Sequence, residues 1–175
     1  LVEKSPVDGV LLEMVIKHLP NPKDAQPYRI PILWKNGDLE TEEGKSMLAC
    51  NKTGKVMGVC FGIVSDEHAG EVGVLRLFSG QIKKGDQVYV SSKKTFGRVQ
   101  QVGVYMGPDR IAAEKLSAGN IGSVVGLKDL YIGETISTDE SEPFEQIKHY
   151  SEPVVTKSIE AKQSKDLAKL IDVLR

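Results

Sequence analysis

The sequence predicts a mainly β protein built around an antiparallel barrel that is closed or nearly closed. Short apolar or alternating runs recur with turn signals between them, and no helical period separates these runs. Glycine supplies 17 of the 175 residues, above the usual share of about 7%, which is typical of many tight turns. Outside the barrel we expect a helix at the N-terminus, and a strand followed by a helix at the C-terminus.

A start signal and an apolar stripe predict the N-terminal helix. Ser5 followed by Pro6 is typical of an N-cap with proline at the first helical position. The next side chains recur at helical spacing and form one stripe: Val7, Leu11, Met14, Val15 and His18. Pro20 and Pro22 then end the helix, because proline cannot continue the hydrogen-bond ladder.

Residues 23–53 show no periodic pattern and are punctuated by proline and glycine. We therefore expect a long connecting arm, although an independent folded unit stays open as the alternative. A few apolar side chains would pin the arm to a domain surface: Tyr28, Ile30, Ile32, Leu33 and Trp34.

The barrel is expected over residues 54–140. An apolar run over residues 56–64 contains internal glycines, which suit barrel corners and bulges. Further strands are expected at residues 71–78, 88–90, 98–105, 121–127 and 134–136.

The C-terminal part changes pattern again. Residues 154–160 resemble a strand, and Ser164 is placed to cap a helix. That helix would carry a stripe of Leu167, Leu170, Ile171 and Leu174. One strand and one helix cannot bury this stripe between themselves, so we expect them to begin a domain that the chain does not complete.

Composition excludes several classes of protein. The 23 basic and 24 acidic residues give a net charge of −1, which excludes a uniformly basic, histone-like surface. Two cysteines exclude a disulfide scaffold. No apolar run reaches the roughly 18 residues of a membrane span, and no signal-peptide pattern is present. We expect a soluble, cytoplasmic protein without a membrane partner.

Two short runs resemble nucleotide-binding motifs, and each fails at a required position. Residues 44–46 read GKS, like the end of a P-loop, but the first glycine of that motif is replaced by Leu39. Residues 51–54 read NKTG, and Gly54 stands where the aspartate of NKxD would read guanine. With DxxG also missing, we expect no nucleotide site in this chain.

Metal and catalytic sites find little support. Cys50, Cys60 and His68 are too far apart in sequence for a zinc clip, and Cys60 lies in an apolar strand, where a small core residue is expected. The other histidines, His18 and His149, have no nucleophile or orienting partner nearby. We expect no catalytic residue, no metal ligand and no small-molecule substrate.

Basic residues cluster in the expected barrel loops. Clustered lysine and arginine can bind a phosphate backbone, although solvated loops often carry lysine without any such role. Arg76 lies on a strand expected to face the same stretch as these loops. The candidate residues are Arg76, Lys83, Lys84, Lys93, Lys94 and Arg98.

A family resemblance runs in order along nearly the whole chain. LLEMVIKHLPNP at residues 11–22 and AQPYRIP at residues 25–31 resemble the end of the GTPase domain in the elongation factor 2 family, archaeal type. HAGEV, RLFSG and KGD within residues 68–86 resemble the opening strands of its second domain, and YMGP, AGNI, GL and GETI within residues 105–136 its later strands. SEPVV, DL and KLI within residues 151–171 resemble the start of its third domain.

The resemblance implies a segment of a GTP-dependent ribosomal translocase. Residues 1–53 would hold the C-terminal helix of the GTPase domain and the arm, and residues 54–140 the translation-factor β-barrel. Residues 141–175 would hold a linker and the first strand and helix of a ferredoxin-like third domain. One residue departs from the family pattern: Leu75 stands where the family usually has glycine, which concerns the packing of that strand.

In that family the barrel is a non-catalytic module of translation elongation. The implied partners are the ribosome, through small-subunit ribosomal RNA, together with the GTPase domain and the third domain. The six basic residues become candidate contacts to ribosomal RNA. The implied cofactors, GTP and magnesium, belong to the full-length parent, a translational GTPase, and no cofactor belongs to this segment.

Three alternatives stay open. An autonomous nucleic-acid-binding barrel of the OB type would present stacking aromatics. Aromatic residues make up only 6% of the chain, and several of them lie in apolar strand contexts that indicate core: Phe61, Phe78, Tyr89 and Tyr105. A small hydrolase lacks a paired catalytic constellation. A transfer-RNA-delivering factor would have a second barrel where residues 154–175 predict a strand and a helix.

Overall fold

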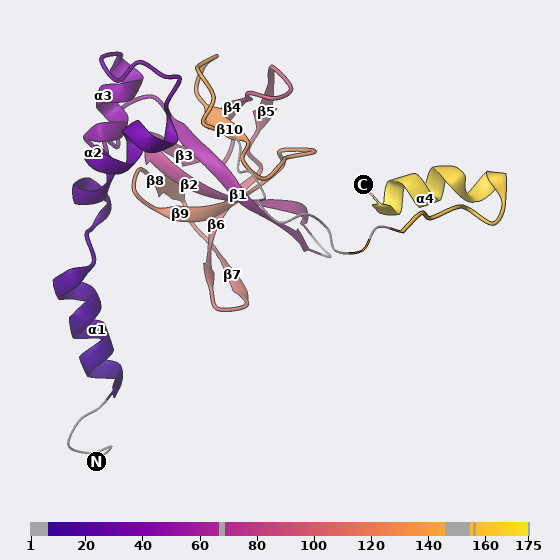
Figure 1. Ribbon diagram of the computed structural model, residues 1–175, viewed down its shortest axis with the longest axis horizontal. Helices are drawn as coiled ribbons and strands as arrows, with labels where there is room; N and C mark the ends of the chain where they lie inside the picture. The colour runs from indigo at the N-terminus through magenta and orange to yellow at the C-terminus, as the bar shows by residue number, and fades with distance from the viewer. Residues whose placement is uncertain (1–6, 67–68, 146–154, 156, 175) are drawn as a thin grey trace.

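A computed structural model describes residues 7–66, 69–145, 155 and 157–174 (Figure 1). The described residues hold ten strands, and every strand pairing is antiparallel, which confirms the mainly β barrel. The strands are Met57–Asp66 (β1), Gly70–Ser79 (β2), Gln81–Lys83 (β3), Gln87–Val90 (β4), Thr95–Arg98 (β5), Gln101–Met106 (β6), Asp109–Ala112 (β7), Lys115–Ser117 (β8), Ile121–Val125 (β9) and Thr135–Ser137 (β10).

Eight strands form one curved sheet in the order β5-β4-β10-β1-β2-β9-β6-β7. The remaining pair, β3 and β8, forms a separate ribbon that packs against β2 and β6. Ile82 of β3 and Leu116 of β8 therefore enter the same core as the large sheet. The large sheet itself ends in two edge strands, β5 and β7.

The barrel core consists of the inward-facing side chains of the alternating strands. Cys60 is fully buried in it, which confirms the small core residue that the sequence predicts. Leu75, which departs from the family pattern, is also fully buried there. The other members are Leu77, Ile82, Val88, Val90, Val99, Val102, Leu116, Val124, Leu127, Leu130 and Ile136.

One expected strand is in fact two. The predicted strand over residues 98–105 is interrupted, because β5 ends at Arg98 and β6 begins at Gln101. Between them, the Val99 backbone N–H donates to the Asp86 carbonyl (2.9 Å) and the Gln100 N–H donates to the Val125 carbonyl (2.8 Å). The apolar pattern continues through this corner because Val99 turns into the core, so alternation alone does not show the break.

The N-terminal helix is confirmed over Val7–His18 (α1). None of its residues is buried, and Figure 1 shows it extending away from the barrel. Its predicted cap, Ser5 and Pro6, lies outside the described residues.

The sequence shows no periodic pattern over residues 23–53, the expected connecting arm, yet this region contains helices Pro22–Leu33 (α2) and Glu42–Leu48 (α3). Each has a capping side chain: Asn21 Oδ1 accepts from the Asp24 N–H (3.2 Å), and Thr41 Oγ1 accepts from the Gly44 N–H (3.2 Å). Two prolines inside α2 hide its helical pattern. They are tolerated because tertiary packing outweighs local propensity.

The two helices pack on the outside of the barrel through a second apolar cluster. Of the five predicted anchors, Ile30 and Trp34 are buried in this cluster, whereas Tyr28, Ile32 and Leu33 are exposed. The other buried members are Met47, Met57, Phe78 and Phe144. The Phe144 ring lies 5.0 Å from that of Phe78 and 6.4 Å from that of Trp34, measured between centroids.

Gln26 joins both helices to the barrel. Its buried Nε2 donates to the Met47 carbonyl of α3 and to the Phe78 carbonyl of β2, the latter at 2.9 Å. The polar link and the apolar cluster together fix the helices against β2.

The C-terminal prediction is met only in its helix. Residues 155 and 157–160 form no strand, while positions 154 and 156 of the predicted strand lie outside the described residues. A strand needs a neighbour to pair with, and this part of the chain has none among the described strands. A 3₁₀ turn, Ser164–Asp166 (η1), leads into the helix Leu167–Leu174 (α4), whose N-cap position is Gln163 rather than Ser164.

Among the described helices, none combines the length and the apolar character that crossing a membrane requires.

Gly80→Ala is expected to destabilise the barrel by about 3 kcal/mol or more. Gly80 has φ +74°, and an added Cβ would lie 2.7 Å from the Val56 backbone. Gly85→Ala is the matched control, because φ is +95° but no atom lies within 4 Å of the added Cβ. The control should lose only about 1 kcal/mol, the cost of the left-handed backbone. Urea unfolding measures both, and equal losses would contradict the close approach at Gly80.

Gln26→Leu is expected to cost about 2 kcal/mol, because a buried carbonyl left without its donor is penalised. Gln87→Leu makes the same change at an exposed position of β4 and should stay within about 0.5 kcal/mol of the parent. Urea unfolding compares the two variants. If Gln26→Leu unfolds at the same urea concentration as Gln87→Leu, Gln26 does not hold the helices on the barrel.

Candidate nucleic-acid interface

The structure separates the six candidate residues into three places. Lys83 and Lys84 lie at the turn between β3 and β4, and Arg98 ends β5 beside them. Two bonds join this turn to the chain after Arg98: Gly85 N–H to the Val99 carbonyl (2.8 Å) and Val99 N–H to the Asp86 carbonyl (2.9 Å). Lys83, Lys84 and Arg98 are all exposed, and we call them the turn cluster.

Lys93 and Lys94 form a second group, the hairpin pair, in the loop that joins β4 to β5. The four residues of β4 separate this loop from the turn cluster, a distance of roughly 13 Å along the strand. Lys93 Nζ contacts Asp129 Oδ2 at 2.6 Å, so its charge is already paired. Lys94 has a left-handed backbone, with φ 50°.

Arg76 lies apart from both groups, and the prediction that it faces the same stretch is wrong. It is in β2, which is separated from β4 by β1 and β10. Leu75 and Leu77 point into the core, so Arg76 points outward. Its guanidinium lies over the Phe78 ring, 5.8 Å from the centroid, on the side of the barrel that carries α2.

The electrostatics of the loops are mixed. Asp86 Oδ2 accepts from the Lys83 backbone N–H at 2.8 Å, which places a carboxylate within the turn cluster. Asp129 places a second carboxylate beside the hairpin pair, where it forms the ion pair with Lys93. Neither group is a purely positive patch, so each could supply only a few phosphate contacts.

The buried position of Cys60 determines the reactivity of its thiol. Burial raises the pKa of the Cys60 thiol to about 11, and its Sγ lies 3.4 Å from the Gly62 carbonyl oxygen. A thiol in this environment is a poor nucleophile and metal ligand, since both roles need the thiolate. Among the described residues, no group of three or more His, Cys, Asp or Glu side chains could hold a metal ion. His68 lies outside them.

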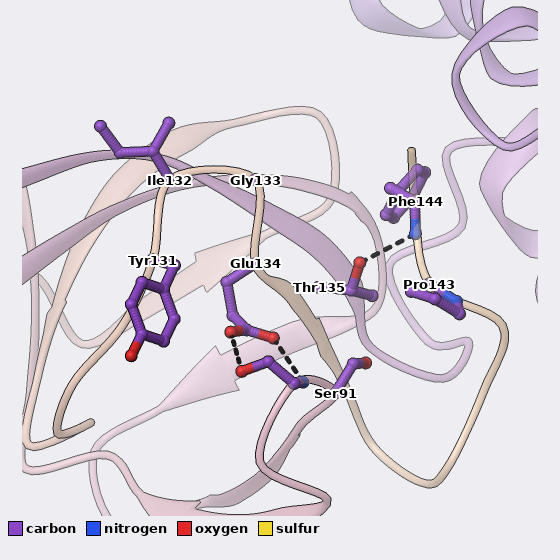
Figure 2. A pocket seen from close by; sticks show the side chains of 9 residues that line it. Ser91, Tyr131, Ile132, Gly133, Glu134, Thr135, Pro143 and Phe144 are labelled. Atoms are coloured by element: carbon purple, nitrogen blue, oxygen red, sulfur yellow. Dashed lines mark hydrogen bonds between the residues drawn. The ribbon is translucent and has the colours of Figure 1, made fainter. Parts of the chain in front are cut away.

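A cavity of about 400 Å³ lies between the loop before β10 and the end of β4 (Figure 2). The buried Glu134 carboxylate accepts from both the backbone N–H of Ser92 (2.9 Å) and the Ser92 hydroxyl. Each carboxylate oxygen therefore accepts one hydrogen bond from Ser92, which ties the loop before β10 to the end of β4. Sequence reasoning reads Glu134 only as part of a strand and could not find this contact, because Ser92 is 42 residues away.

Comparisons with known proteins agree with this architecture. Residues 70–137 match the family model described as Elongation factor Tu domain 2. The barrel, with helices on its outer side, is thus a module of a translation elongation factor.

Individual relatives identify which family of translation elongation factors the chain belongs to. The chain is 56% identical to Elongation factor 2 of Methanocaldococcus jannaschii and 51% identical to that of Thermococcus gammatolerans, in each case over 100% of the chain and 24% of the relative. It is also 51% identical to Elongation factor 2 of Methanopyrus kandleri, over 99% of the chain and 14% of that relative. The chain belongs to the elongation factor 2 family, and it spans about a quarter or less of the length of these relatives.

Cys60 is expected to resist thiol reagents in the folded protein. In a Cys50→Ala variant, Cys60 is the only thiol, and with a pKa of about 11 roughly one molecule in a thousand is ionised at pH 8. Disulfide-exchange labelling at pH 8 should therefore be slow in buffer and complete in denaturant. The raised pKa also makes the thiol stabilising below its unfolded pKa of 9.0, a contribution lost as the pH rises towards 11. Labelling in buffer at the denatured rate would contradict this burial.

Proposed function

We propose that the chain is the β-barrel segment of a GTP-dependent ribosomal translocase and has no catalytic role of its own. In this proposal residues 1–53 are the last helix of the GTPase domain and its connection, and residues 54–140 are the barrel. Residues 141–175 lead into the third domain. The barrel docks on the GTPase domain and on small-subunit ribosomal RNA, in the cytoplasm, while GTP and magnesium bind elsewhere in the full-length factor.

The observation that carries the proposal is the extent of the similarity. The alignments at 50% or more identity extend over the flanking helices as well as the barrel, which supports a segment of Elongation factor 2 rather than the common barrel alone. The exposure of α1 is consistent with this. None of its residues is buried, and its apolar side chains are largely exposed, with Leu12 at 63% and Ile16 at 80%, as expected of a helix that packs on another domain.

The placement of the GKS run supports a non-catalytic role. A P-loop cradles phosphate in a glycine-rich loop that precedes a helix. Gly44 instead lies inside α3, where an added Cβ would come within 2.6 Å of the Leu39 backbone. The backbone around Gly44 is therefore closed by its own chain and offers no phosphate cradle.

An autonomous OB-type barrel finds less support. Of the four aromatic residues expected in the core, Phe78 and Tyr89 are buried and Tyr105 is half-buried, whereas the expectation for Phe61 is wrong.

Charge reversal in the full-length factor tests the proposal. Replacing the turn cluster with glutamate, as Lys83→Glu, Lys84→Glu and Arg98→Glu together, should weaken ribosome binding and flatten its salt dependence by about two to three log units per log unit of salt. Lys93→Glu with Lys94→Glu should flatten it by only about 0.7 to 0.9, because Lys93 is already paired with Asp129.

Ribosome affinity across a potassium chloride series measures both effects. Exposed loop charges contribute under about 1 kcal/mol each to folding, so the variants should keep the parent melting temperature to within a few degrees. If both variants keep the parent slope, the loops are solvated and do not contact RNA. If the full-length parent itself fails to bind ribosomes, the proposed function is wrong.

A further inference from the structure

Arg110, in β7, is a second outward-facing arginine that the loop clusters do not include. Its Nε donates to Ser123 Oγ at 2.8 Å, and its Nη1 donates to Gln101 Oε1 at 3.0 Å. The side chain thus crosses β6 and reaches β9. Gly103 makes this path possible, because a Cβ there would lie 3.2 Å from Arg110 Nε and 3.1 Å from Ser123 Oγ.

The remaining nitrogen of Arg110 has no acceptor. Nη2 is buried and makes no hydrogen bond with the described residues. An unpaired charged donor costs more than an ordinary hydrogen bond contributes, so an incoming acceptor would be favoured. Gln101 is exposed, and its displacement would open the edge formed by Nη1 and Nη2, the fork that binds carboxylate or phosphate oxygens in pairs.

Strand register places Arg76 on the same face. Arg76 pairs with Ile121 of β9, and Tyr105 of β6 pairs with Arg110 of β7. The β6–β9 register, which sets Gly103 opposite Ser123, brings Tyr105 level with Ile121. One row across four strands therefore reads Arg76, Ile121, Tyr105, Arg110, and we call the surface around this row the outer face.

The outer face is positively charged and partly apolar. Its arginines lie three strands apart, about 14 Å between backbones, and the outward positions of β2, β9, β6 and β7 carry no aspartate or glutamate. Between the arginines, Ile121 is 49% exposed. This differs from the turn cluster and the hairpin pair, each of which contains a carboxylate.

We propose that the outer face binds the phosphate backbone of RNA, with Arg110 and Arg76 each holding one phosphate and Ile121 lying against the sugars between them. The inference rests on the proposed ribosomal function and identifies a different surface for it than the loop lysines. Charge complementarity favours this occupant, since two cations on a face whose outward strand positions carry no carboxylate suit a regularly charged polyanion. An acidic protein segment is the other possible occupant and is an outcome of the test.

A carboxylate placed between the two arginines provides the sharpest test. In the full-length factor, Ile121→Glu should weaken binding to ribosomes about tenfold or more at moderate salt, because it repels phosphate and pairs with both guanidiniums. Ile121→Gln is the matched control, equal in size and exposure, and should bind within about twofold of the parent. Ile121→Glu binding as well as Ile121→Gln would overturn the inference.

Arginine variants and cross-linking complete the test. Arg110→Ala and Arg76→Ala should each reduce the salt slope by about 0.7 to 0.9, and Arg29→Ala, on the exposed side of α2, should leave it unchanged. Arg110→Lys keeps the charge without the fork, so it should keep the slope and lose affinity.

A photoreactive residue at position 121 should label ribosomal RNA; labelling of ribosomal protein alone would overturn the RNA assignment. Parent binding with all variants unchanged would reject only this inference, whereas no parent binding would reject the proposed function too.

Discussion

The arrangement of helices on the barrel depends on one buried amide. Gln26 is almost fully buried, and its Nε2 donates to backbone carbonyls of both α3 and β2. A buried donor must find acceptors, and these two exist only when α2 and α3 lie in this one position on the barrel. The apolar cluster around Phe144 stabilises the contact between the helices and the barrel, but apolar packing is not directional. The hydrogen bonds of the amide are directional, so they specify the position of the helices on the barrel.

That docking has an effect on the surface. The helices cover the outer side of Phe78, and the Phe78 ring in turn lies beneath the guanidinium of Arg76. The position of this arginine is thus set by the same cluster that holds the helices. Arg110 is positioned differently, by Ser123 and Gln101 on neighbouring strands. Two unrelated sets of contacts produce one row of cations across the sheet, which is a property of strand register rather than of any local motif.

Sequence patterns predicted those parts of the fold in which local signals agree with packing. Turn glycines and alternating apolar residues located the main strands, and Cys60 was correctly expected in the core. They did not predict α2, because its prolines oppose helix formation and only tertiary contacts outweigh them. The candidate site was predicted only as residue types. Lys93 is paired with Asp129, 36 residues away, and Arg110, which is not among the predicted candidates, is held by Ser123, 13 residues away, so neither environment has a local sequence signal.

The open sheet has a consequence for how the protein behaves at high concentration. Its two edge strands, β5 and β7, each present backbone groups that could pair with another molecule. Each is only four residues long, and each includes an arginine, Arg98 or Arg110. Short edges that carry charged side chains are poor templates for strand addition, since few ladder bonds form. The barrel can therefore leave its sheet unclosed and still resist the edge-to-edge association that leads to aggregation.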